Sequence, residues 1–147
     1  MAGTARRTAA ELLADARRLI ARVDPGTAWA ASAAGEALIV DVRSDDERRR
    51  DGIVPGSVHI PRTVLEWRVD PESGWSNRHV ADTGRRLILL CAHGWSSSLA
   101  AATLVDLGYR DAGDVEGGFE AWLAAGLPTA PAAERPAGAL PGMAPPD

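Results

Sequence analysis

The stretch LILLCAHGWSSSLA, residues 87–100, decides how the chain folds. Its four leading apolar residues are too few for a helix and suit a strand that is buried on both faces. The strand ends at Cys91, the chain's only cysteine, and after a short loop a run rich in Ala and Leu predicts a helix with Ser97 or Ser98 as its N-cap. In such a turn, backbone N–H groups and the helix dipole converge on one point. A thiol at that point is expected to ionise readily and to attack as a thiolate.

The composition is that of an acidic globular chain. Its 147 residues suit one domain, and 46% of them are hydrophobic. The net charge is −4, and all 16 basic residues are arginines. This balance provides no electrostatic footprint for nucleic acid or for an anionic membrane. Because one cysteine cannot form an internal disulfide, a reducing, cytoplasmic location is expected. We also expect neither a membrane span nor a secretion signal, since no apolar run has the length or the position for one.

The rest of the chain alternates predicted helices with predicted strands. Helices are expected at residues 8–23, 27–34, 44–50, 63–69 and 119–125, the third opened by a capping-box pattern of Ser44 and Glu47. Further strands are expected at residues 37–43, 57–61 and 111–115. This alternation predicts a parallel sheet covered on both faces, with its site beyond the carboxyl ends of the strands, where Cys91 falls. The first helix either packs on the domain or forms a dimer contact.

Five segments together make the chain resemble the rhodanese-like (sulfurtransferase) domain family between about Ala37 and Pro128. They are LIVDVR at 38–43, GIVPGSVHIP at 52–61, the Cys91 strand and loop at 87–97, LGY at 107–109 and EGGFEAWLAAGLP at 116–128. The resemblance implies an α/β fold, a three-layer α/β/α sandwich on a mainly parallel five-stranded sheet, here with an extra N-terminal helix. Three shorter pieces, at 48–52, 62–71 and 97–101, look like a small, single-domain actinobacterial type of the family.

The same comparison divides the chain into three parts. Residues 1–26 hold the N-terminal helix, expected to pack on the domain, and residues 27–128 form the rhodanese-like domain. Residues 129–147 contain half of the prolines and few large apolar side chains, which predicts a mobile or polyproline-like tail.

The resemblance implies that Cys91 carries a sulfane sulfur. Its thiolate would take the outer sulfur of a donor as a persulfide and pass it to a thiol or another nucleophilic acceptor. Loop N–H groups would hold the anionic sulfur as an oxyanion hole holds oxygen. The resemblance implies that the loop residues Ala92, His93, Gly94, Trp95, Ser96 and Ser97 bind the substrate. The expected partners are a small donor (thiosulfate or an organic persulfide) and a thiol acceptor, bound by a monomer or a homodimer. Neither a cofactor nor a metal is expected, because three scattered histidines and one cysteine do not form a metal site.

The loop departs from the family's common Cys-x-x-Gly-x-Arg-Ser form, because Ser96 stands where the arginine would be. An arginine there would bind an oxyanion such as thiosulfate and stabilise the thiolate. Use of thiosulfate is therefore left open, and Arg62 and Arg68, which flank the next strand end, are candidates to supply the missing charge. Arg43, at another strand end, is a third candidate for substrate binding. Asp41 is expected to support it, either beside the substrate or in a structural ion pair.

Each site residue also has a structural interpretation. Cys91 would then be a buried core thiol, His93 a solvent-facing loop residue and Trp95 a packing contact rather than the lip for an apolar donor. The corresponding alternative for the whole chain is a non-catalytic rhodanese-like module with a binding or regulatory role. His59 is expected to be a core histidine whose ring nitrogen has a partner.

Three further residues of the resemblance have structural roles. Gly117 and Gly118 are expected to permit a turn and close packing. Trp122 is expected to anchor the last helix.

Cysteine phosphatases resemble this fold but need Cys-x5-Arg, and Ser97 occupies that arginine's place.

Overall fold

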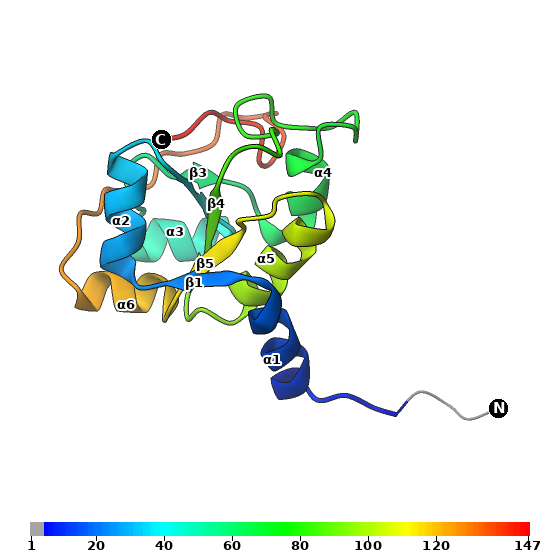
Figure 1. The fold of residues 1–147 in the computed structure, drawn as a ribbon. Coiled ribbons are helices and arrows are strands. Elements are labelled where there is room, and N and C mark those ends of the chain that lie inside the picture. The colour runs from blue at the N-terminus through cyan, green and yellow to red at the C-terminus, as the bar shows by residue number, and fades with distance from the viewer. Residues whose placement is uncertain (1–4) are drawn as a thin grey trace.

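Five parallel strands form the middle layer of the computed structural model, which describes residues 5–147 (Figure 1). The strands are β1 (Ala21–Val23), β2 (Leu38–Asp41), β3 (Val58–His59), β4 (Leu87–Leu90) and β5 (Gly113–Val115). Their order in the sheet is β1-β5-β4-β2-β3, so β4 lies at the centre. All four of its side chains are at most 1% exposed, as expected for a strand covered on both faces. The α/β fold with a five-stranded parallel sheet is therefore confirmed.

Helices form the two outer layers. They are α1 (Ala9–Leu19), α2 (Pro25–Ala33), α3 (Asp45–Asp51), α4 (Leu65–Val69, preceded by the 3-10 turn η1, Arg62–Val64), α5 (Ser96–Asp106) and α6 (Gly118–Ala124). In Figure 1, α4 and α5 cover one face of the sheet and α2, α3 and α6 lie on the other. α1 packs against α5. No helix in residues 5–147 is long and apolar enough to cross a membrane.

Two apolar cores result, one on each face of the sheet. The first gathers Leu104 and Tyr109 under α4 and α5, and the second gathers Phe119 and Trp122 under α2 and α6. Trp122 is fully buried, and its indole N–H donates to the carbonyl of Pro128 at 2.9 Å. The predicted anchoring of the last helix by Trp122 is confirmed.

Local sequence determines α3 as predicted. The Ser44 hydroxyl accepts the backbone N–H of Glu47 at 3.1 Å, and the Glu47 carboxylate accepts the backbone N–H of Ser44 at 3.2 Å. This reciprocal capping box satisfies two N–H groups that the first helical turn leaves without partners.

The helix predicted for residues 8–23 is wrong at its C-terminal end. α1 stops at Leu19, and Ala21–Val23 form the edge strand β1, which pairs in parallel with β5. Val23 continues the apolar helical spacing of α1, which is why the pattern favoured a longer helix. Pairing with residues some 90 positions away overrides it: Glu116 donates its N–H to the carbonyl of Val23 at 2.8 Å. Tight contact with β5 also needs Gly113, where a Cβ would lie 1.8 Å from the Ala21 carbonyl oxygen.

The predicted N-cap of the helix after Cys91 is also wrong. α5 begins at Ser96 after Trp95, and Ser97 and Ser98 lie inside its first turn, both fully buried. Their hydroxyl groups do not cap the helix, because they make hydrogen bonds in the site described below.

Residues 129–147 contain no helix and no strand, and hydrogen bonds attach them to the domain. The amide nitrogen of the buried Asn77 side chain donates to the carbonyls of Gly142 at 2.9 Å and Ala144 at 2.8 Å. Ala130 forms an antiparallel bridge with Ile53. The segment therefore lies along the surface in a defined path (Figure 1).

Candidate functional site

Cys91 follows the central strand directly, and the loop after it wraps around its sulfur. The side chain is buried, with 5% of the residue exposed. Its Sγ accepts the backbone N–H of Gly94 at 3.1 Å and that of Ser97 at 3.4 Å. The thiol also donates to the Ser97 hydroxyl, with 3.2 Å between Sγ and Oγ. This is the arrangement expected of a strand that leads into a helix N-terminus.

Two opposing effects act on the thiol. Burial raises the pKa of Cys91, because a thiolate is poorly solvated inside the protein. Hydrogen bonds from the Ser97 hydroxyl and amide, the Ser96 hydroxyl and the Gly94 amide lower that pKa, and together they outweigh the burial. The pKa of Cys91 therefore lies below its usual value, so the loop favours the nucleophilic thiolate.

The glycine pair Gly117-Gly118 fixes the loop from the α6 side. Phe119 donates its N–H to the carbonyl of Cys91 at 2.8 Å, so the start of α6 is held against the loop. A Cβ on Gly118 would lie 2.5 Å from the Cys91 carbonyl oxygen, and a Cβ on Gly94 would lie 2.8 Å from the nitrogen of Gly117. Both glycines of the pair have positive φ, 74° and 63°. The predicted turn and close packing at this pair are confirmed.

Behind the loop, away from the sulfur, the carbonyl oxygen of Gly94 accepts several hydrogen bonds. Arg17 of α1 donates through Nη2 at 2.9 Å and Arg22 of β1 through Nη2 at 3.2 Å. The Ser98 hydroxyl lies 3.2 Å from the same oxygen. With its carbonyl held in this direction, the peptide that joins Gly94 to Trp95 has a fixed orientation.

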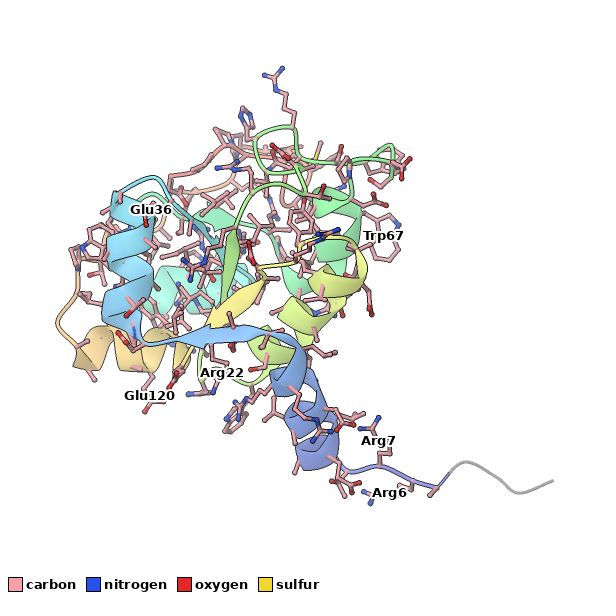
Figure 2. The ribbon with its side chains drawn as sticks, in the orientation of Figure 1. Arg6, Arg7, Arg22, Glu36, Trp67 and Glu120 are labelled. Carbon is pink, nitrogen blue, oxygen red and sulfur yellow. The ribbon has the colours of Figure 1, made fainter. Side chains whose placement is uncertain are left out.

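Asp114, in the middle of β5, completes the wall behind the loop. Its carboxylate is fully buried and accepts the hydroxyl groups of Ser97 and Ser98, each at 2.7 Å. Nε of Arg22 donates to the same carboxylate at 2.9 Å, and this contact is an ion pair. Arg22 thus connects Asp114 with the carbonyl of Gly94. In Figure 2, the label of Arg22 lies below β1 and that of Glu120 lies below α6, both in the lower half of the view.

Arg17, Arg22 and Asp114 were not among the residues predicted for the site. A carboxylate between Gly113 and Val115, in a strand predicted to be buried, was a usable signal for Asp114. The sequence held no comparable signal for the arginines, because both fall within the range predicted as one long helix, residues 8–23.

His93, Trp95 and Glu120 border the mouth of the loop. Nδ1 of His93 lies 2.7 Å from Oε2 of Glu120, and the ring centroids of His93 and Trp95 are 5.5 Å apart. Trp95 is 65% exposed, and together with Gly117 and Ala121 these residues line a shallow, mainly apolar hollow. Trp95 therefore lies on the surface rather than in a packed interior.

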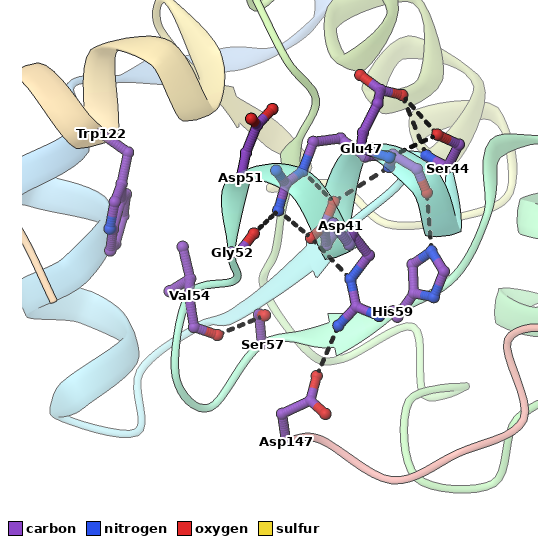
Figure 3. Close-up of polar contacts among 12 residues, drawn as sticks. Asp41, Ser44, Glu47, Asp51, Gly52, Val54, Ser57, His59, Trp122 and Asp147 are labelled. Carbon is purple, nitrogen blue, oxygen red and sulfur yellow. Dashed lines mark hydrogen bonds and ion pairs between the residues drawn. The ribbon is translucent and has the colours of Figure 1, made fainter. Parts of the chain in front are cut away.

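Asp41 and Arg43 form a buried ion pair (Figure 3). The Arg43 guanidinium donates to the Asp41 carboxylate at 3.0 Å and 2.8 Å and to the carbonyl of Gly52 at 2.8 Å, and it stacks 3.9 Å above the ring of Phe119. Arg48 also contacts Asp41, at 3.3 Å. These contacts join β2 to the turn after α3. Arg43 reaches the site as one wall of a second hollow, which Ala92 and His93 also line.

Arg62 and Arg68 are engaged away from the loop. Arg62 forms an ion pair with Glu66 at 2.7 Å. Arg68 donates to the carbonyls of Trp75 at 2.9 Å and Pro141 at 2.7 Å, which attaches the C-terminal segment to α4. Within residues 5–147, neither guanidinium forms a hydrogen bond with the Cys91 loop. The cations that do contact the loop are Arg17 and Arg22.

The groups that surround the Cys91 sulfur are backbone N–H groups and a hydroxyl group. Among the described residues, no three His, Cys, Asp or Glu side chains converge as metal ligands do. His59 lies apart, and its Nε2 is 2.7 Å from the carbonyl oxygen of Arg43, so its ring nitrogen has the expected partner.

Comparison with known proteins places this geometry in context. The family model of the rhodanese-like domain matches residues 24–125. The thiosulfate sulfurtransferase GlpE of Pseudomonas savastanoi pv. phaseolicola is 38% identical over 103 residues, which is 70% of this chain and 87% of that protein.

Solved structures share the fold. A protein of unknown function from Rhodopseudomonas palustris, named as a possible tyrosine phosphatase, has a TM-score of 0.80 and 35% identity over 88% of this chain and 99% of its own. A thiosulfate sulfurtransferase from Pseudomonas aeruginosa has a TM-score of 0.67 and 25% identity over 90% of this chain and 24% of its own. The similarity in sequence and in fold includes the strand and loop that carry Cys91.

Proposed function

The chain belongs to the rhodanese-like domain family, and on that basis we propose that it is a sulfurtransferase that carries a sulfane sulfur as a persulfide on Cys91. The observation that supports this most directly is the sulfur's environment. The buried Sγ accepts two backbone N–H groups and lies within hydrogen-bonding distance of the Ser97 hydroxyl, and its pKa is lowered.

The loop also has donors to spare for a second sulfur. Within the described residues, the N–H groups of Trp95 and Ser96 have no hydrogen-bond acceptor. They belong to the turn that opens α5, where the first N–H groups of a helix lack intrahelical partners. An anionic persulfide sulfur bonded to Sγ is the kind of group that such free N–H groups bind.

The proposed reaction has two displacement steps. The Cys91 thiolate attacks the outer sulfur of an organic persulfide, the donor's S–S bond breaks, and the donor thiolate leaves with the bonding electron pair. Cys91 then holds the outer sulfur as a persulfide anion. An acceptor thiolate attacks that sulfur, the Cys91 S–S bond breaks, and the Cys91 thiolate is regenerated. The two steps need no additional oxidant or reductant.

We propose an organic persulfide rather than thiosulfate as the preferred donor. Thiosulfate carries a sulfonate group that a guanidinium inside the loop would bind, but Ser96 stands at that position. Arg17 and Arg22 bind the carbonyl of Gly94 from behind the loop, and Arg43 is paired with Asp41. The exposed ring of Trp95 offers an apolar surface that suits an organic group.

A cysteine phosphatase activity fits the loop less well. Such enzymes bind phosphate with an arginine at the position that Ser97 occupies in this chain. Here the hydroxyl of Ser97 contacts Asp114 and the sulfur itself, so the position holds no cation.

We also propose a cytoplasmic location, because a lone reactive thiol suits a reducing compartment.

Mass spectrometry of the intact protein tests the proposal. After incubation with glutathione persulfide, the mass should increase by that of one sulfur atom, and glutathione in excess should remove the addition. The Cys91→Ser variant should gain nothing. Absence of the added sulfur with both glutathione persulfide and thiosulfate would contradict the proposal and favour a non-catalytic binding module.

A further inference from the structure

The wall behind the Cys91 loop contains an ion pair, buried at Asp114 and partly exposed at Arg22, that the proposed reaction does not use. Arg22 approaches from β1 and Asp114 from β5, with 2.9 Å between Nε and Oδ1. Asp114 is fully buried, and the side chain of Arg22 is 22% exposed. Because burial weakens solvent screening, removing either partner alone would leave a charge close to the loop with little compensation.

Both partners are connected to the sulfur through one intermediate residue. Arg22 donates to the carbonyl of Gly94, and the N–H of Gly94 donates to Sγ of Cys91. Asp114 accepts the hydroxyl of Ser97 at 2.7 Å, and that hydroxyl oxygen lies 3.2 Å from Sγ. Arg17 supports the arrangement from α1 with a second hydrogen bond to the carbonyl of Gly94, at 2.9 Å.

We propose that Arg17, Arg22 and Asp114 are positioning residues that hold the Cys91 loop from behind and set how readily the thiol ionises, in place of the guanidinium that the loop lacks. The arginines contribute positive charge and fix the Gly94 peptide. Asp114 contributes negative charge and competes with the thiolate for the single hydrogen of the Ser97 hydroxyl. The two kinds of residue therefore act on the thiolate in opposite directions.

The other charged side chains around the loop have partners of their own, although Nη1 of the buried Arg43 has none among the described residues. On the β2 side, Arg43 is paired with Asp41, and at the start of α6, His93 contacts Glu120. α5 presents the hydroxyl groups of Ser97 and Ser98 to Asp114 and no charged side chain. Substitution of Arg22 or Asp114 therefore changes the charge behind the loop without altering the residues at its mouth.

Alkylation by iodoacetamide measures the effect directly. The reagent is uncharged, and because Cys91 is the only cysteine, the pH dependence of the rate reports the pKa of that thiol. Arg22→Gln should raise the pKa of Cys91 and slow alkylation at neutral pH by about three- to tenfold, the size expected for loss of a nearby charge. Asp114→Asn should lower the pKa. The double variant should return the pKa toward the wild-type value.

Arg18→Gln is the matched control for Arg17→Gln. Arg18 is the next residue of α1 and forms an ion pair with Asp15 at the surface. Arg17→Gln should raise the pKa of Cys91, and Arg18→Gln should leave it unchanged. If Arg22→Gln destabilises the fold, Arg22→Lys can be used instead, because lysine keeps the charge but cannot contact both Asp114 and the Gly94 carbonyl in the same way. The pKa of Cys91 in Arg22→Lys should lie between its values in the wild type and in Arg22→Gln.

The result separates a positioning role from a structural one. If the variants lower the melting temperature but leave the pKa of Cys91 unchanged, or if Arg22→Gln and Asp114→Asn shift it in the same direction, the inference is wrong. Its relevance to sulfur transfer rests on the proposed function. Alkylation needs no sulfur donor, so the inference can fail while persulfide formation is observed. Conversely, the pKa shifts can be observed in a protein that forms no persulfide.

Discussion

The hydroxyl oxygen of Ser97 lies 3.2 Å from the sulfur of Cys91, inside the first turn of the helix that follows the loop. The backbone N–H of Ser97 points at the same sulfur from 3.4 Å. Ser97 therefore places both its hydroxyl and its backbone N–H beside the sulfur, and only the first of these groups depends on its side chain. Substitution of Ser97 can separate the contribution of the hydroxyl from that of the backbone.

Ser97→Ala should raise the pKa of Cys91, because the thiolate loses a hydroxyl donor but keeps the two backbone donors. The iodoacetamide rate profile should move to higher pH while the loop keeps its shape. Ser98→Ala is the matched control: Ser98 shares the contact with Asp114 but makes no hydrogen bond to the sulfur. Equal profiles for the two variants would contradict the role given to the Ser97 hydroxyl.

Ser96→Arg tests the origin of donor preference. A guanidinium at this position adds a positive charge at the loop, which should favour thiosulfate over glutathione persulfide. The ratio of the two kcat/KM values should move toward thiosulfate, mainly through a lower KM for that donor. The conservative variant Ser96→Thr should keep the wild-type ratio. An unchanged ratio in Ser96→Arg would mean that the loop charge does not control the choice of donor.

Gly118→Ala should destabilise the fold more than Gly126→Ala. Both glycines have positive φ, 63° and 68°, so an alanine at either position costs about 1–2 kcal/mol in backbone conformation. Only Gly118 faces an obstacle, since its Cβ would lie 2.5 Å from the Cys91 carbonyl oxygen, whereas nothing lies within 4 Å at Gly126. Urea unfolding measures the difference. Equal losses in the two variants would contradict close packing of the glycine pair on the loop.

His59 predicts a loss of stability in mild acid. Burial lowers the pKa of His59, and the nearby charge of Arg48 acts in the same direction. The unfolded chain then binds a proton more readily than the folded protein as the pH falls below about 6.5, the usual value for histidine. The free energy of unfolding should therefore be highest above that pH and should decrease as the pH falls through the lowered folded-state value. This part of the decrease should be absent in His59→Asn, measured by urea unfolding across the range.

Segments whose structure depends on neighbouring residues were predictable. The central strand follows from the apolar run that ends at Cys91, and α3 follows from the capping box of Ser44 and Glu47. In both cases the signal lies within a few residues of the feature. The position of Cys91 at the carboxyl end of the central strand follows from the same local patterns together with the topology of parallel sheets.

Features that depend on distant contacts were not predictable. Arg17 and Arg22 reach the carbonyl of Gly94 across 77 and 72 positions of sequence, and nothing near either arginine indicates that partner. β1 has three residues, too few for a strand pattern, and its pairing with β5 replaced the helix that the local spacing favoured. Candidate charges were sought at strand ends, whereas two of them came from the chain's first helix and first strand.

β1 and its arginine also affect where the domain begins. The similarity to the family starts at residue 24, one residue after β1 ends. A chain trimmed to that boundary would lose an edge strand of the sheet and both arginines that hold the loop, and β5 would become an open edge. Its thiol would then lack the charge and the contacts that both arginines provide behind the loop, even if the remaining four strands folded normally. For this chain, the unit that shapes the reactive cysteine is longer than the region by which the family is recognised.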